Sequence, residues 1–462
     1  MKIILTCHQF FPDYSSGTEV LVYSVAKELQ KYGHHVIVFC ASPIKKDITD
    51  KFRFDTYNFS GIKVIRFWYS FTPMGNQTNV MSLEYDNQFV ADYFRDILTS
   101  ELPDIVHFFH FGRITSSLIP ECTIKSIPCF FTPTDFWVTC PLNQLLLANG
   151  ALCSGPQLNS TNCIKHLATI RLPFLNRVLN KIPNLIFKYT IQWVSYFLGK
   201  NNQLVQMIVA VTKRHEIINS RINRLNAIFV PNHFMAKILA KNGISKKLMH
   251  HSPYGINLNS DKPPQKPHPE NYLRIGFIGT ISPNKGLHVL LKAVRLLSVL
   301  KVEIKIYGDL TLYPDYVSKI IPLIEDDSRI KLCGTFDNTN IHNIFAGMDV
   351  LVVPSIWYEN TPLVIYSAQS CGCPVIASDI GSIPEVIVHG KNGLLFPPGQ
   401  IDRLAEAITH INEDRRLLKK LSDNAIYPRS ITNYVAELLQ YYQNAKIKES
   451  PKETYHRELI HE

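Results

Sequence analysis

Residues 354–385, PSIWYENTPLVIYSAQSCGCPVIASDIGSIPE, decide the fold class of this chain. They follow the run 349–353, whose consecutive apolar residues predict a strand buried on both faces of a parallel sheet. A polar loop with Glu359 then leads to Thr361-Pro362, the predicted N-cap and first residue of a helix that ends before Gly372. A carboxylate beside a helix N-terminus, where a parallel strand ends, indicates a ligand site that accepts from sugar hydroxyls and donates to phosphate oxygens.

The same alternation of strand and helix extends outward on both sides of this stretch. We expect the strands at 2–7, 36–40, 62–68, 105–109, 129–132, 207–211, 227–231, 273–278, 302–307, 330–333, 350–353 and 375–377. Helical patterns separate many of them, at 17–33, 233–242, 286–300, 313–325, 401–412 and 415–425. The chain is therefore predicted to be α/β, with doubly wound parallel sheets.

Length and one break in the pattern predict two domains. A chain of 462 residues exceeds what one core usually supports. Residues 257–271 hold four prolines among polar residues and read as a linker. The expected domains are 1–256 and 272–426, followed by a helix at 427–445 that packs back on the first domain and a charged tail at 446–462. Two such domains would hold a ligand in the cleft between their strand ends.

Composition excludes several classes of protein. The chain has 48 Lys and Arg against 38 Asp and Glu, but it has no dense basic tract and no nucleic-acid module, so nucleic acid is not an expected partner. The N-terminus reads as a short strand and not as a signal peptide, and no apolar run is long enough to span a membrane. We therefore expect a cytoplasmic protein whose ten cysteines are mostly reduced.

Two further loops suggest anion binding. The segment 276–286, GFIGTISPNKG, ends a strand in glycine, carries Lys285 and opens the next helix with Gly286. It lacks the spacing of a P-loop, and a tight turn with a solvated lysine is the alternative. The segment 11–19, FPDYSSGTE, lies between the first strand and the first helix, where Gly17 would let the chain approach a phosphate. A flexible turn capped by Thr18 is the alternative there.

Together these loops resemble the group 1 glycosyltransferases, the retaining family 4 enzymes with the two-domain GT-B fold. The resemblance covers about residues 1–445. The matching motifs are 17–19, 279–286, and Glu359 followed by 372–378 and 381–385; two lesser matches are 253–256 and 392–396.

The resemblance implies a site for a nucleotide-diphospho-sugar in the cleft. Lys285 would neutralise the diphosphate and Gly17 would let the first helix approach it. Glu359 would bond the donor sugar. The remaining contacts would come from Gly279, Thr280, Asn360, Thr361, Pro362, Leu363 and Ser367. The resemblance also implies no cofactor and no catalytic metal. Lys285 and the helix dipoles would neutralise the diphosphate, as a divalent ion does in other enzymes.

Three positions depart from the family pattern. Thr280 stands where an arginine is usual, and Ser367 stands where a second glutamate bonds the ribose, a loss worth about 1.5–3 kcal/mol. Thr134 replaces a histidine that precedes Asp135. His107 and His110 end the preceding predicted strand, and His110 is the candidate to substitute, with a packed or surface histidine as the alternative for both. The catalytic candidates are thus Glu359, Lys285, Asp135 and His110.

Residues 140–205 read as a basic and aromatic insertion. Cys140, Cys153, Cys163 and His166 are potential zinc ligands. Their spacing matches no standard finger, so scattered reduced cysteines are favoured over a structural zinc site. From 164 to 205, lysines and arginines alternate with aromatic and aliphatic residues, which suits an anionic membrane surface. A helical pair packed on the first domain is the alternative.

We therefore expect a retaining glycosyltransferase that moves a sugar from a nucleotide-diphospho-sugar to a glycan or lipid-linked acceptor. Bacterial envelope polysaccharide synthesis is the expected setting, by analogy with the family. The location would be cytoplasmic, with possible attachment to the inner face of the plasma membrane. The alternative is a GT-B protein that binds nucleotide sugar or glycan with weak or no catalysis; a phosphorylase or epimerase has no specific support.

Overall fold

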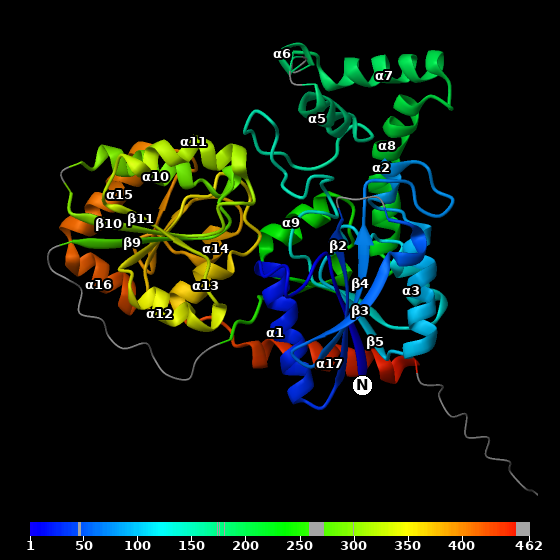
Figure 1. Cartoon of the computed structure of the whole chain (residues 1–462), viewed down its shortest axis with the longest axis horizontal. Coiled ribbons are helices and arrows are strands. Elements are labelled where there is room, and N and C mark those ends of the chain that lie inside the picture. Colours follow the sequence, from blue (N-terminus) through cyan, green and yellow to red (C-terminus); the bar gives the residue numbers. More distant parts are fainter. Residues whose placement is uncertain are drawn as a thin grey trace, which may run out of the picture.

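The computed structural model describes residues 1–44, 48–172, 174, 176–179, 181–257, 272–298 and 300–449. The chain folds into two α/β domains that lie side by side (Figure 1). This confirms the predicted fold class, two doubly wound Rossmann-like domains. Part of the linker, 258–271, and the end of the tail, 450–462, lie outside the described residues.

The first domain is built on an eight-stranded sheet in the order β3-β4-β2-β1-β5-β6-β7-β8. Neighbouring strands are parallel except for the antiparallel pair β3 and β4. The strands are β1 Lys2–Cys7, β2 His35–Pro43, β3 Phe54–Phe59, β4 Ile62–Tyr69, β5 Ile105–Phe108, β6 Cys129–Phe131, β7 Ala227–Val230 and β8 Met249–His251. The helices are α1 Gly17–Lys31, α2 Val80–Leu83, α3 Gln88–Glu101, α4 Leu118–Ile124, α5 Thr161–Arg171, α6 Asn176–Leu179, α7 Asn184–Leu198, α8 Gln203–Ile222 and α9 His233–Lys241.

The second domain is built on a six-stranded parallel sheet in the order β11-β10-β9-β12-β13-β14. Its strands are β9 Leu273–Ile278, β10 Val302–Tyr307, β11 Ile330–Gly334, β12 Val350–Val353, β13 Val375–Ser378 and β14 Gly393–Phe396. Its helices are α10 Leu287–Leu296, α11 Pro314–Glu325, α12 Ile341–Ala346, α13 Leu363–Ser370, α14 Ile383–Val386, α15 Ile401–Glu413 and α16 Arg415–Asp423.

The last helix, α17 (Ile431–Glu449), returns from the second domain and lies along the first (Figure 1). Tyr434 and Tyr442 are fully buried in the same apolar cluster as residues of β1, α1 and β2. Tyr442 is also hydrogen-bonded to His107, and Tyr434 lies 3.1 Å from the hydroxyl of Thr132. The core of the first domain thus contains residues from both ends of the chain.

Two local expectations are wrong. The apolar segment 207–211 is not a strand; it lies inside α8, which buries Val205, Ala210, Val211, Arg214, Ile218 and Ile222 at helical spacing. The helix after Glu359 begins at Leu363 with Pro362 at its N-cap, one residue later than expected, so Thr361 does not cap it. The sequence reading also omitted β3, β8 and β14.

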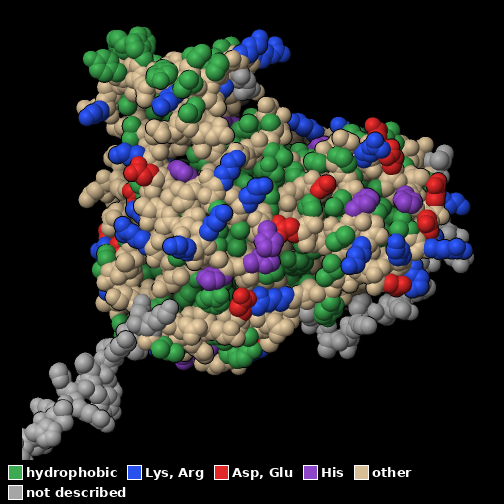
Figure 2. Space-filling model, turned by 180° about the vertical axis from the view of Figure 1, so that it is seen from behind, with side chains coloured by type: hydrophobic (Ala, Val, Ile, Leu, Met, Phe, Trp, Pro, Cys, Tyr) green, Lys and Arg blue, Asp and Glu red, His purple; other side chains and the backbone are tan. Residues whose placement is uncertain are grey.

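Helices α5, α6 and α7 project beyond the rest of the first domain (Figure 1). No described residue of α7 is buried. Its exposed large side chains include Trp193, Tyr196 and Phe197, and Figure 2 shows apolar side chains gathered at this end of the molecule with Lys and Arg beside them. Within the described ranges, none of the helices has the length and apolar character to cross a membrane.

Candidate functional site

The loop after β12 and the loop after β9 meet in an ion pair. The Nζ atom of Lys285 lies 2.7 Å from Oε1 and 3.0 Å from Oε2 of Glu359. Glu359 also accepts hydrogen bonds from the Ser355 hydroxyl at 2.6 Å and the Trp357 indole at 2.8 Å. The Lys285 ammonium lies 5.3 Å from the centre of the Trp357 ring, which adds a cation–π contact.

Glu359 is almost completely buried, yet it is ionised. Burial alone would raise its pKa, but the charge of Lys285 and the three hydrogen bonds outweigh that effect and hold the pKa of Glu359 below its ordinary value. The pair therefore keeps a fixed negative charge and a fixed positive charge at the carboxyl end of the second sheet.

Gly286 makes this pairing possible. It has a φ of 71°, and a Cβ atom there would lie 1.9 Å from the carbonyl oxygen of Pro354. Only glycine fits both the backbone conformation and the close approach of the two loops. Gly279, at the end of β9, has open space around it, and Thr280 follows it half-buried.

The first turns of α1 and α13 face each other across the domain boundary. A Cβ atom on Gly17 would lie 3.8 Å from Cδ1 of Leu363, and Leu363 packs against the core of the first domain. Because both residues begin helices, the first amide groups of both helices lack intrahelical acceptors. The two helix N-termini together form a positively polarised region next to Lys285 and Glu359.

Asn360 and Thr361 join the domains in this structure. The Asn360 amide donates to the Pro133 carbonyl and to the Tyr254 hydroxyl, each at 2.9 Å. The amide of Asn232, in turn, donates to the Asn360 side chain at 3.0 Å and to the Thr361 hydroxyl at 2.9 Å. The side chains of Asn360 and Thr361 were predicted to contact the sugar donor. In this structure they form hydrogen bonds with residues of the first domain.

Ser367 lies on α13 and donates its hydroxyl to the Leu363 carbonyl at 3.1 Å. It therefore bonds its own helix, one turn back, where the family pattern has a ribose-binding glutamate. Thr134 donates to the Phe109 carbonyl at 2.9 Å and stabilises the loop that carries Asp135.

His110 and Asp135 form a second pair, on the first domain. Nε2 of His110 lies 2.7 Å from Oδ2 of Asp135, and the Gly112 amide donates to Nδ1 of His110 at 2.8 Å. Since an amide can only donate, Nδ1 is unprotonated and Nε2 carries the proton toward Asp135. His107, by contrast, is a core residue: burial lowers its pKa to about 3, and its ring bonds Tyr442 and Thr132.

The sequence reading missed two neighbours of His110. The His8 ring lies 4.0 Å from the His110 ring, and Nε2 of His8 lies 3.5 Å from the buried carboxyl of Glu19. Arg113 donates to the side chain of Gln9 at 2.9 Å. Both His8 and Arg113 follow predicted strands, at 2–7 and 105–109, and that position was the signal available for finding them.

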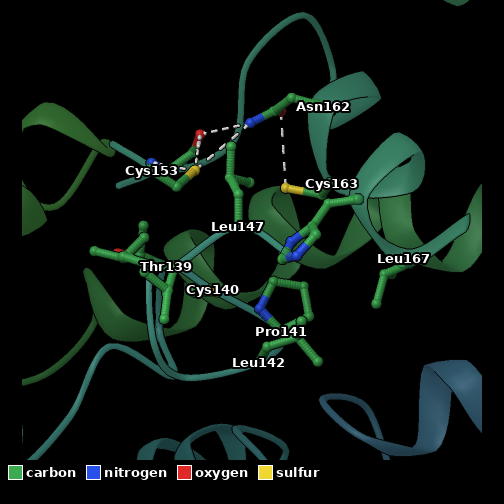
Figure 3. A pocket seen from close by; sticks show the side chains of 13 residues that line it. Thr139, Cys140, Pro141, Leu142, Leu147, Cys153, Asn162, Cys163 and Leu167 are labelled. Atoms are coloured by element: carbon green, nitrogen blue, oxygen red, sulfur yellow. Dashed lines mark hydrogen bonds between the residues drawn. The ribbon is translucent and has the colours of Figure 1, made fainter. Parts of the chain in front are cut away.

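Cys140, Cys153, Cys163 and His166 line one small cavity of about 20 Å³ (Figure 3). Their ligand atoms do not converge. The Asn162 amide donates to the sulfur of Cys153 at 3.9 Å, and the thiol of Cys163 donates to the Asn162 carbonyl oxygen at 3.8 Å.

In the described part of the chain, one trio brings potential metal-binding atoms within 4.8 Å of one another: His233, His251 and Glu385, all exposed. The Glu385 carboxylate already accepts from the His233 and Phe234 amides.

Comparison with known proteins identifies the second domain. Residues 259–427 match the family model described as "Glycosyl transferases group 1". The chain is 29% identical over 175 residues to an "Uncharacterized 41.2 kDa protein in cps region" of Klebsiella pneumoniae, covering 37% of this chain and 47% of that protein. It is 27% identical over 139 residues to the "D-inositol 3-phosphate glycosyltransferase" of Mycobacterium tuberculosis, covering 30% of this chain and 29% of that protein. The chain thus spans less than half the length of these curated relatives.

Two solved structures share the whole two-domain fold. Anabaena HepE, in complex with UDP and glucose, has a TM-score of 0.63 at 17% identity, covering 96% of this chain and 99% of that one. The sucrose-phosphate synthase of Thermosynechococcus elongatus has a TM-score of 0.65 at 16% identity, covering 97% and 99%.

Proposed function

Because residues 259–427 match the group 1 glycosyl transferases, we propose that the chain belongs to this family and transfers a sugar from a nucleotide-diphospho-sugar to a glycan or lipid-linked acceptor with retention of configuration. The observation that carries the proposal is the position of Lys285, paired with Glu359 beside the facing N-termini of α1 and α13. A lysine and two helix N-termini are a ready-made site for a diphosphate.

The leaving diphosphate sets the chemistry of the proposed reaction. When the bond from the sugar to the diphosphate breaks, negative charge develops on the phosphate oxygen. Lys285 and the first amides of α13 would stabilise that charge, which is the largest catalytic contribution in sites of this type. We propose that no divalent ion is needed for this step. The acceptor would attack from the face that the nucleotide leaves, through an oxocarbenium-like state.

Glu359 would have two roles in this scheme. Before the donor binds, it compensates the charge of Lys285. Once the diphosphate attracts Lys285, a carboxylate oxygen of Glu359 becomes available to accept from a sugar hydroxyl. Asp135 and His110 lie on the opposite domain and would face the reacting sugar and the acceptor, with Asp135 fixing the orientation of His110.

The surface of α5–α7 fits a membrane-bound acceptor. No Asp or Glu lies between Asp135 and Glu216, whereas eight Lys and Arg do, and α7 exposes an aromatic row of Tyr189, Trp193, Tyr196 and Phe197. Aromatic side chains enter the headgroup region while lysines and arginines attract anionic lipids. We propose that the enzyme works at a membrane surface in envelope polysaccharide assembly; the Klebsiella relative, named for a cps region, supports this setting.

Assay of the purified chain against a panel of nucleotide sugars, with release of the nucleoside diphosphate as readout, tests the proposal. We expect slow hydrolysis of one donor without acceptor, and loss of that hydrolysis in Lys285→Ala. Lys292→Ala, on the following helix, is the matched control. Donor binding without hydrolysis or transfer would favour the alternative, a GT-B protein that only binds nucleotide sugar. This alternative is worth testing because Thr134 and Ser367 stand where the family pattern has a histidine and a glutamate.

A further inference from the structure

A cavity of about 590 Å³ opens in the first domain beside His110 and Asp135. Its volume lies in the range of small-molecule sites. It lies where β2 and β4 end, at Pro43 and Tyr69, and every residue that lines it belongs to the first domain: His8, Pro43, Ile44, Tyr69, Ser70, Phe71, Thr72, Glu84, His110, Gly112, Arg113, Trp137, Pro141 and Asn143. The cavity does not include the residues proposed to bind the sugar donor, which are Lys285, Glu359 and those of α13.

Arg113 is a cation in this cavity that forms no ion pair with another described residue. Its side chain is partly buried, and its hydrogen bonds go to the carbonyl of His8 and the side chain of Gln9 through one nitrogen, Nη1. No ion pair of its guanidinium is found among the described residues, although the Glu19 carboxylate is close enough to act on its charge. The other side of the planar fork is available to a bidentate acceptor such as phosphate.

The acidic residue that lines the cavity is already paired, and two further carboxylates lie close to it. Glu84 lines it but accepts from Arg214 through both oxygens, at 2.8 and 3.2 Å. Glu19 is fully buried, bonded to the Ser16 hydroxyl and 3.5 Å from His8. Asp135 faces His110. Among the residues that line the cavity, Arg113 is therefore the cation without an ion pair, although the Glu19 carboxylate is close enough to act on its charge.

The surroundings make this charge costly for the free protein. Burial lowers the pKa of Arg113 from its ordinary value, because water is partly excluded from the guanidinium. A desolvated cation is stabilised most by an anion in direct contact. The adjacent His8 and His110 rings can add hydrogen bonds, and Tyr69 and Trp137 provide apolar walls.

We propose that this cavity holds the acceptor and that Arg113 binds a phosphate group on it, so that the acceptor is a phosphorylated molecule. The inference rests on the proposed transferase function and names the class of its acceptor. Two sources have this chemistry: a sugar phosphate in solution and a lipid-linked diphosphate. The second agrees with the basic, aromatic surface of α5–α7, which extends from the same domain.

Binding measurements on the full chain test the proposal, with glucose, glucose 6-phosphate, glucuronate and farnesyl diphosphate as probes and UDP present throughout. We expect the phosphorylated probes to bind and glucose to bind far more weakly. Arg113→Gln should weaken their binding about 10- to 100-fold, since a charged hydrogen bond is lost. Arg113→Lys should restore part of the affinity, and Arg224→Gln, an exposed arginine elsewhere in the domain, should leave it unchanged.

Several outcomes would overturn the inference. Equal binding of glucose and glucose 6-phosphate would show that phosphate is not recognised, and stronger binding of glucuronate would make the group a carboxylate. If Arg113→Gln weakened the binding of UDP as strongly as that of the probes, Arg113 would belong to the donor site. The two phosphorylated probes together identify the source: a preference for farnesyl diphosphate indicates a lipid-linked acceptor. If UDP fails to bind while glucose 6-phosphate binds through Arg113, the transferase proposal fails and the phosphate site stands.

Discussion

The ammonium group of Lys285 is 2.7 Å from the nearer carboxylate oxygen of Glu359, so the site contains an ion pair. Breaking such a pair by removing one partner leaves a buried charge without compensation. We therefore expect Lys285→Met to lower the free energy of unfolding by about 3–5 kcal/mol. The double variant Lys285→Met/Glu359→Gln should recover much of that loss, because no charge remains buried. A double-mutant cycle from urea unfolding measures both; additive single effects would contradict the coupling.

The same pair predicts how stability depends on pH. The pKa of Glu359 is held below its ordinary value in the folded protein, so its contribution to stability is fully present above that ordinary value and is lost as pH falls through the folded pKa. We expect the stability difference between the unaltered protein and Glu359→Gln to be largest near neutral pH and to shrink below about pH 4. Urea midpoints over this range measure it, and a constant difference would mean that Glu359 is not stabilised as an anion.

Gly112 controls the position of His110. A Cβ atom on Gly112 would lie 2.7 Å from Cε1 and 3.0 Å from Nδ1 of the His110 ring. Gly112→Ala should therefore displace the imidazole from Asp135 and reduce transfer about 100-fold, the usual effect of a misplaced group, with little change in thermal stability. Gly347→Ala is the control, since its Cβ would meet only ordinary contacts at 3.5 Å. If Gly112→Ala transferred sugar at the unaltered rate, His110 would have no role in the reaction.

The exposed face of α7 should bind anionic membranes. We expect the purified protein to sediment with phosphatidylcholine vesicles that contain phosphatidylglycerol, and to remain in solution with phosphatidylcholine alone. Trp193→Ser/Tyr196→Ser should reduce binding to the anionic vesicles, whereas Tyr427→Ser, an exposed residue outside α5–α7, should not. Raised salt should weaken the interaction as well. Equal binding to both vesicles, or none, would count against a membrane surface.

Cys153 and Cys163, in the small cavity, should remain protonated thiols. Burial raises the pKa of Cys153, and it raises the pKa of Cys163 to about 12, while both sulfurs contact Asn162 instead of converging. We expect metal analysis of the purified protein to find no stoichiometric zinc and Cys153→Ser to leave the metal content unchanged. One zinc per chain, lost in Cys153→Ser, would instead establish a Cys3His site.

Local sequence pattern was sufficient for the architecture, because buried parallel strands are short apolar runs and their helices follow at regular intervals. The pattern gave a wrong prediction where an apolar run could belong either to a strand or to a helix. Residues 207–211 are apolar in sequence, but they are one part of the 20-residue helix α8, whose burial period only a longer window reveals. The antiparallel strand β3 is half-exposed at the sheet edge, so it lacks the apolar run that marks its neighbours.

The candidate site was less accessible to sequence reasoning. Glu359 and Lys285 were found from the loops that carry them, but their mutual contact joins residues 74 positions apart. Asn360 was expected to meet the donor, whereas its contacts lie 106 and 227 positions away in the other domain. Arg113 has no local pattern at all: its importance comes from its place in a cavity where no described residue forms an ion pair with it, which only the fold reveals.

The helix α17 has a consequence for how this protein is made. Its side chains Tyr434, Val435, Leu438 and Tyr442 are buried among the strands and helix formed by the first 40 residues. On the ribosome, the N-terminal sheet is complete long before these residues are synthesised. The second domain, which is contiguous in sequence, can fold as soon as it emerges, whereas the first must wait, with an apolar surface uncovered, until the last helix is released. We therefore expect the first domain to finish folding after the second.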